Sequence, residues 1–101
     1  MGKVKIGIEK RCTNFLTKGI GLMFSNKPKT TLLVNKREKP TSIHTFFMKF
    51  YIDVYWLDDR KKIVHKQKMK PWMLSKVKVA KYVLETKSGV LDADVGDEFV
   101  F

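Results

Sequence analysis

The sequence predicts a mainly β protein: one compact domain over residues 1–101, built as a mostly antiparallel β-sandwich or barrel with one or two short helical segments. Three observations support this fold class. A chain of 101 residues suffices for one hydrophobic core. Apolar and polar residues alternate in several stretches, which is the period of a half-buried strand. Turn residues recur about every ten positions, as in sandwiches and barrels.

The first stretch, residues 3–8, alternates lysine, glycine and aliphatic residues and predicts an N-terminal strand. The pattern then changes. Thr13 or Asn14 is suited to capping a short helix that would stop at Gly19 or Gly21. The two glycines are equally compatible with a loop.

A β-branched and aliphatic run at residues 30–34 predicts the next strand. The charged residues 35–40 should then form a loop, because Pro40 has no N–H to donate to a strand ladder. A new strand is expected to begin after this proline.

The stretch IHTFFMKFYIDVYWLD, residues 43–58, is the most apolar part of the chain. One set of alternate positions is apolar after His44 and the other is amphipathic, which predicts a strand with one face in the core. Because the stretch is longer than a usual strand, a bend or bulge is expected at residues 49–51.

The second half of the chain predicts strands and turns in alternation. The expected order is a hairpin turn at 58–61, a strand at 62–70, a break at 71–72, a strand at 77–84, turns at 87–89 and 95–97, and a closing strand at 99–101.

The protein is strongly basic and the charge is unevenly distributed. Its formal net charge is +11. Residues 1–81 contain 20 lysines and arginines against five acidic residues, whereas residues 82–101 contain one lysine against five. A charged N-terminus and the lack of a long apolar run predict a cytoplasmic protein without a membrane anchor. The single cysteine, Cys12, excludes an intramolecular disulfide.

Several blocks of the sequence together resemble the small prokaryotic family known as domain of unknown function 192. The blocks are GLMF at 21–24, IHTFFMKFYIDVYWLD at 43–58, KPW at 70–72, AKYVLE at 80–85, Gly89 and VGD at 95–97. The resemblance implies a β-rich fold of the sandwich or jelly-roll sort, of the cytoplasmic archaeal type, with no established biochemical activity. The sequence departs from the family pattern at Ser25, where arginine is usual, at Tyr51, where proline is usual, and at Lys61, where glycine is usual.

Our leading functional prediction is a non-catalytic module that binds a small ligand or a protein. Its site would lie at one open end of the β-fold, where pockets of small β-proteins tend to occur. The expected ligand-binding residues are His44, Thr45, Phe47, Asp53 and Trp72. Trp72 can instead plug the end of the core, because tryptophans are usually well buried.

The alternative prediction is a module that binds nucleic acid or another polyanion through a lysine-rich face. Six lysines lie within sixteen residues of one another: Lys66, Lys68, Lys70, Lys76, Lys78 and Lys81. Lysines beside exposed aromatic rings are suited to holding single-stranded nucleic acid. Lysine-rich surfaces are also typical of proteins from hot environments, which is the competing explanation.

A third hypothesis is a hydrolase in which Asp53 orients His44 as a general base. No nucleophile accompanies this pair in the sequence, so an enzyme is less favoured than a binding module. Cys12 and His44 are a second conceivable pair, of thiol and imidazole. The spacing of Cys12, His44 and His65 matches no metal site, and the acidic residues between 92 and 98 suit a solvated turn. We therefore predict no metal and no cofactor.

Overall fold

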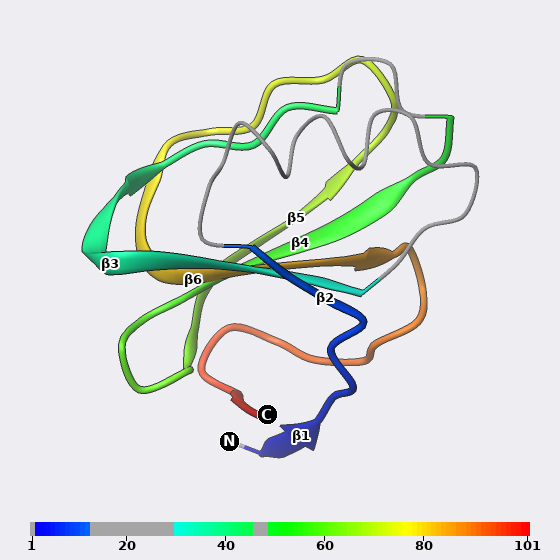
Figure 1. The fold of residues 1–101 in the computed structure, drawn as a ribbon. Coiled ribbons are helices and arrows are strands. Elements are labelled where there is room, and N and C mark those ends of the chain that lie inside the picture. The colour runs from blue at the N-terminus through cyan, green and yellow to red at the C-terminus, as the bar shows by residue number, and fades with distance from the viewer. Residues whose placement is uncertain (1, 13–29, 46–48) are drawn as a thin grey trace.

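The computed structural model describes residues 2–12, 30–45 and 49–101 of the chain. These residues form seven strands in two sheets (Figure 1). The strands are β1 Lys3–Lys5, β2 Lys10–Cys12, β3 Thr31–Thr41, β4 Ile52–Leu57, β5 Ile63–Met69, β6 Lys78–Lys87 and β7 Glu98–Val100. The prediction of a mainly β chain is confirmed. The predicted helical segment at residues 13–21 and the block GLMF lie outside the described residues.

The larger sheet has the strand order β2-β3-β6-β4-β5. Its three central pairings, β3 with β6, β6 with β4 and β4 with β5, are antiparallel. The pairing of β2 with β3 is parallel, as is that of β1 with β7 in the small sheet. Within the described residues neither sheet closes on itself, so the barrel and jelly-roll versions of the prediction are not confirmed.

The core lies on both faces of the large sheet. The first face carries Val54 and Trp56 in a buried cluster with Leu33, Ile43, Ile52, Met69, Ala80 and Val83. The second face carries Tyr55 and Leu57 in a buried cluster with Leu32, Ile63, Leu84, Ala93 and Phe99. The prediction that this strand would have only one face in the core is therefore wrong for β4. Both sets of alternate residues in β4 are covered, and Asp53 is the half-buried exception.

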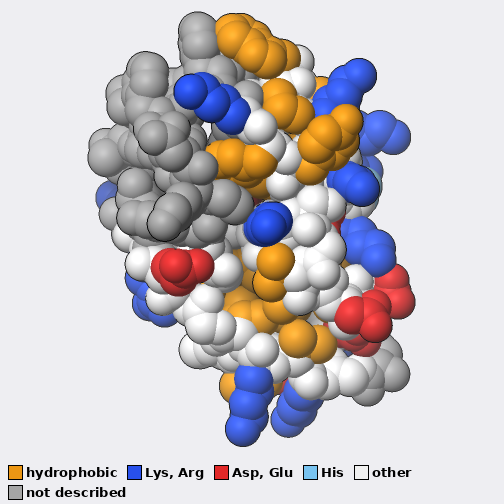
Figure 2. Space-filling model, turned by 90° about the vertical axis from the view of Figure 1, so that its right-hand side faces the viewer, with side chains coloured by type: hydrophobic (Ala, Val, Ile, Leu, Met, Phe, Trp, Pro, Cys, Tyr) orange, Lys and Arg blue, Asp and Glu red, His pale blue; other side chains and the backbone are white. Residues whose placement is uncertain are grey.

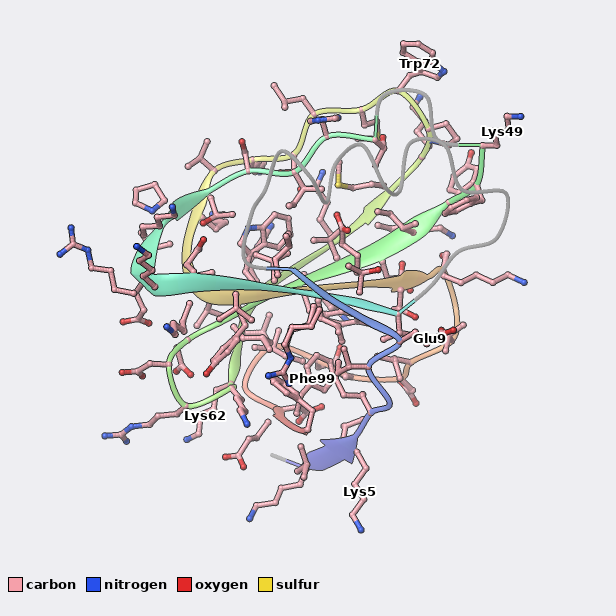
Figure 3. All side chains as sticks on the ribbon, in the orientation of Figure 1. Lys5, Glu9, Lys49, Lys62, Trp72 and Phe99 are labelled. Carbon is pink, nitrogen blue, oxygen red and sulfur yellow. The ribbon has the colours of Figure 1, made fainter. Side chains whose placement is uncertain are left out.

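Two chain segments cover the two faces. On the first face, the indole Nε1 of Trp56 donates a hydrogen bond of 3.1 Å to the carbonyl of Thr41, which fixes the chain that leaves β3 above the sheet. On the second face, the Phe99 ring meets the Tyr55 ring edge-on at 5.2 Å between centroids. Figure 3 shows Phe99 turned inward beneath the sheet. Burying an aromatic side chain of this size contributes roughly 1.5–3 kcal/mol.

Strand β3 is longer than the sequence predicts, because it continues through Pro40. A register shift between Val34 and Lys39 inserts extra residues, after which Pro40 pairs with Val79 of β6. The neighbouring β2 pairs with β3 only at residues 31–33. The far end of β3 is thus an edge in the described structure, where a missing N–H donor is tolerated.

Most predicted turns are confirmed. The chain is irregular from Lys49 to Tyr51 before β4 begins, and turns occur at residues 59–60, 71–72, 88–89 and 95–96. Lys61 closes the β4–β5 hairpin with a φ of 66°, a left-handed conformation that favours glycine. Its side chain compensates by donating a hydrogen bond of 2.9 Å to the Phe101 carbonyl and by lying 4.3 Å from the Phe101 ring centroid.

The left-handed backbone at Lys61 yields a stability prediction. Replacing Lys61 by glycine or by alanine removes the same contacts with Phe101, but only alanine keeps the strain on a side chain at positive φ. We expect Lys61→Gly to be more stable than Lys61→Ala by about 1 kcal/mol, measured as the free energy of unfolding in urea. Equal stabilities, or a more stable alanine variant, would contradict a strained turn.

Candidate functional site

Thr45 lies in the segment after β3 that covers the first face of the sheet, and it binds residues 70–73, which follow β5. Its backbone N–H donates to the Met73 carbonyl at 2.8 Å, and its carbonyl accepts from the Trp72 N–H at 2.9 Å. Its hydroxyl donates to the Lys70 carbonyl at 2.7 Å and accepts from the Met73 N–H at 2.8 Å. Thr45 is fully buried. These four hydrogen bonds make Thr45 a positioning residue for residues 70–73.

The pairing between these two segments continues at Ile43 and Ser75. The Ser75 N–H donates to the Ile43 carbonyl at 2.8 Å, and the Ile43 N–H donates to the Ser75 hydroxyl, also at 2.8 Å. Between them, His44 and Leu74 form an isolated antiparallel bridge. In Figure 1 the two segments run side by side above the large sheet. The backbone of residues 72–75 is therefore fixed by hydrogen bonds to a segment thirty residues earlier in the chain.

This ordered segment carries a stripe of exposed apolar side chains, which we call the Trp72 stripe. Its members and exposed fractions are Trp72 60%, Leu74 65%, Val77 62% and Val79 55%. Met73, Ser75 and Ala80 point inward and are half-buried or buried. Figure 2 shows hydrophobic side chains beside basic ones toward the upper end of one face of the molecule. The stripe is thus the outward side of a segment whose inward side is part of the fold.

Trp72 projects from the end of the molecule, as Figure 3 shows. The alternative prediction, in which this side chain plugs the core, is wrong because 60% of its surface is exposed. Trp72 also has a φ of 63°. A bulky residue with positive φ carries a conformational cost of order 1–3 kcal/mol, and such strain is concentrated at functional positions.

The structure separates the predicted ligand-binding residues. Thr45 and Trp72 are hydrogen-bonded through their backbones, and His44 pairs with Leu74 in the same two segments. Phe47 lies outside the described residues. Asp53 lines a groove with Tyr55 and Ala93, both in the cluster on the second face of the sheet, whereas Ile43 packs on the first. The hydrolase pair of His44 and Asp53 therefore gains no support from the geometry.

The six predicted lysines do not form one face. Lys66 and Lys68 pair with Tyr55 and Asp53 across the β4–β5 ladder and line the same groove. The ammonium group of Lys66 is held by the Asp94 carboxylate and the Ala93 carbonyl. This hydrogen bond with Asp94 raises the pKa of Lys66.

The remaining lysines of this group lie elsewhere. The ammonium group of Lys81 donates to the carbonyls of Asn35 and Lys36, and Lys70 is exposed at the end of β5. Lys76 and Lys78 lie close enough to His65 to affect its titration. Burial lowers the pKa of His65, and the charges of Lys78 and then Lys76 lower it further.

A groove of about 260 Å³ opens on the second face beside β5, and we call it the Tyr55 groove. Its polar side chains come from β4 (Asp53 and Tyr55), from β5 (Lys66 and Lys68) and from the loop before β7 (Asp92). Burial raises the pKa of Tyr55 to about 12, assisted by the negative charges of Asp53, Asp92 and Asp94. The phenol therefore stays protonated throughout the physiological range.

The sequence interpretation missed both the Trp72 stripe and Tyr55. The stripe was detectable in principle, because four large apolar residues fall within eight positions that also contain Lys76 and Lys78. Tyr55 follows Asp53 by two positions, which places both on one side of a strand. Nothing in the sequence indicates that Asp92 lies opposite them.

Searching the described ranges for metal ligands finds no group of three or more His, Cys, Asp and Glu side chains that could hold an ion. The same ranges contain no helix long and apolar enough to cross a membrane.

The environment of His65 predicts a pH dependence. Because the folded-state pKa lies below the unfolded value of about 6.5, the unfolded chain binds a proton first as the pH falls. Stability should be fully present above pH 6.5 and should decline below it until the folded-state pKa is reached. In an NMR titration, Lys78→Gln should raise the pKa of His65, whereas Lys68→Gln should leave it unchanged. A pKa of 6.5 or higher in the parent protein would contradict this electrostatic picture.

Comparison with known proteins places this chain among uncharacterised archaeal relatives. A family model described as an uncharacterized ACR, DUF192, matches residues 3–100. The UPF0127 protein of Thermococcus sibiricus is 36% identical over 104 residues, covering 96% of this chain and 68% of the relative. The UPF0127 proteins of Pyrococcus furiosus and Pyrococcus abyssi are 37% and 35% identical, covering 92% and 96% of this chain and 86% and 84% of the relatives. No solved structure matches. The chain therefore belongs to the DUF192 family, whose function is unknown, as its ordered sequence blocks predict.

Proposed function

We propose that this protein is a binding module that recognises an extended, acidic segment of a partner protein through the Trp72 stripe. The observation that carries the proposal is the exposure of Trp72, Leu74, Val77 and Val79, each more than half exposed on one segment. Single exposed apolar residues are ordinary, whereas a series of them on one surface is typical of an interaction site. Tryptophan is also among the residues that contribute most to binding energy in protein interfaces.

The rigidity of the stripe supports recognition of a partner. Trp72 and Leu74 flank Met73, whose backbone N–H and carbonyl are both bonded to Thr45. A surface that is already ordered loses little conformational entropy when it binds. A partner segment of eight residues in an extended conformation would span about 26 Å, which is long enough to contact several members of the stripe at once.

The charges around the stripe favour an acidic partner. Lys70 and Lys76 are exposed on either side of Leu74, and Lys78 is half-buried between Val77 and Val79. Two copies of this chain would bring these lysines against one another, and like charges in an interface are unfavourable. A segment that alternates acidic and apolar side chains complements both properties of the surface.

The test uses a synthetic eight-residue peptide that alternates leucine and glutamate, with an alternating leucine and lysine peptide as the charge control. We expect the acidic peptide to bind with micromolar affinity and to shift the fluorescence of exposed Trp72, since Trp56 is buried. Trp72→Ser should weaken binding at least tenfold. Val95→Ser is the matched control, because Val95 is 58% exposed outside the stripe.

Three results would contradict the proposal: no binding of the acidic peptide, equal binding of the basic peptide, or equal affinity in the Trp72→Ser variant. The melting temperatures of the variants should match that of the parent protein, because the substituted side chains are mostly exposed. Sedimentation of the unliganded protein as a dimer that Trp72→Ser dissolves would assign the stripe to self-association instead.

A second candidate function, polyanion binding, is favoured by the concentration of positive charge around His65. Burial lowers the pKa of this histidine most, and the charges of Lys78 and Lys76 lower it further, so positive charge is concentrated at that surface. Lys66 and Lys81 are engaged within the chain, so the lysines of this proposal reduce to Lys68, Lys70, Lys76 and Lys78.

Fluorescence anisotropy of labelled single-stranded RNA at several salt concentrations tests the second candidate. A phosphate-binding surface should lose affinity steeply as salt rises, and Lys76→Gln with Lys78→Gln should reduce the slope by about 1.4 on a single strand. The double variant Lys5→Gln with Lys87→Gln removes the same charge away from His65 and is the control. An equal reduction in both double variants would indicate attraction by net charge alone.

A further inference from the structure

We propose that the Tyr55 groove binds a small organic cation, a protonated primary amine attached to a short hydrocarbon chain. This site is separate from the Trp72 stripe, because its side chains lie on the second face of the sheet and in the loop before β7. Its polar members are two carboxylates, a phenol, two lysines and Gln67, and its apolar members are Leu91 and Ala93. The proposal does not depend on the proposed protein-binding function.

Tyr55 provides an oxygen at the floor of the groove. The residue is only 3% exposed and lines the groove. Among the hydrogen bonds of the described residues, none involves its hydroxyl, and this oxygen is not one of the fully buried side-chain atoms that lack a partner, so it faces the groove. A bound ammonium group would satisfy it, because an ammonium donates three hydrogen bonds and the phenol oxygen can accept one.

Asp53 provides a carboxylate of fixed orientation beside this hydroxyl. One of its oxygens accepts from the Gly89 N–H at 2.9 Å, and the other accepts from the Ser88 hydroxyl at 3.3 Å. Each carboxylate oxygen can accept more than one hydrogen bond. Asp53 can therefore hold a cationic donor without giving up the contacts that position it.

The groove carries a small excess of negative charge although the protein is basic, because the carboxylates of Asp53, Asp92 and Asp94 outnumber the ammonium groups of Lys66 and Lys68. The formal net charge is +11, yet Tyr55 titrates under the influence of three carboxylates. One of these, Asp94, is neutralised by Lys66. The ammonium group of Lys68 lies 5.6 Å from the Tyr51 ring centroid. Asp53 and Asp92 remain as acceptors, which favours a cation over an anion.

The apolar wall of the groove explains why an organic cation is favoured over a metal ion. Leu91 and the Tyr55 ring offer hydrocarbon contacts, which an alkyl chain can use and a hydrated ion cannot. The described residues also contain no group of side chains suited to a metal ion. An amine with a short alkyl chain matches both the oxygens and the apolar wall.

The experiment titrates the protein with butylamine hydrochloride at pH 7 and follows backbone amide signals by NMR. Butanol and sodium butyrate are matched probes without a charge and with the opposite charge. We expect saturable shifts at residues of β4, β5 and the 91–93 loop for butylamine alone. A lysine that is acetylated at its amino end and amidated at its carboxyl end serves as a further probe. Because it and butylamine are both primary amines, comparing their affinities shows whether a free amine or a lysyl side chain is the better ligand.

Four variants make the proposal falsifiable. Asp92→Asn, at an exposed position, and Tyr55→Phe, which keeps the ring against Phe99, should each weaken butylamine binding at least fivefold. Lys68→Gln should strengthen it about twofold, because it removes a like charge from the groove. Asp59→Asn, in the β4–β5 turn, should have no effect. Absence of saturable shifts, equal shifts with butanol, or unchanged affinity in both Asp92→Asn and Tyr55→Phe would overturn the proposal.

Discussion

The burial of strand β4 on both faces is the constraint on which the rest of the structure depends. A strand with Trp56 on one side and Tyr55 on the other leaves apolar surface on two sides of the sheet, and each must be removed from water. The chain therefore supplies two covers. Residues 41–45 and 73–75 cover the first face, and the segment that ends in Phe99 covers the second.

Both candidate surfaces follow from these covers. The Trp72 stripe is the outer side of the first cover, because Met73 and Ser75 use the inner side for packing and hydrogen bonding. The Tyr55 groove lies at the margin of the second cover, where the loop carrying Asp92 passes over β4 and β5. The sheet thus presents an apolar, basic surface on one side and a small groove lined by carboxylates and lysines on the other.

The sequence alone predicts much of the fold. Alternation identified β5, and turn residues located the hairpin at 58–61 and the break at 71–72. The continuation of β3 through Pro40 was missed because a register shift, which local patterns do not indicate, makes the proline an acceptable strand residue.

Much of the site was not predictable, for a related reason. Strand alternation shows which residues share a side, but it does not show which side another segment will cover. Sequence patterns therefore favour a buried Trp72 and group Asp53 with Thr45, whereas in the structure Trp72 is exposed, Asp53 lines the Tyr55 groove and Thr45 is bonded to residues 70–73. The family resemblance did indicate the unusual hairpin residue, Lys61, which has the positive φ that glycine favours.

The pairing of β1 with β7 has a consequence for the order in which the protein folds. These strands are parallel and join residues 3–5 to residues 98–100, and the two chain ends lie side by side in Figure 1. Contacts between such distant residues close a large loop and form slowly. During synthesis, β1 has no partner strand until residue 100 has left the ribosome. We therefore expect the second cover to be completed only after strands β3 to β6 have been synthesised.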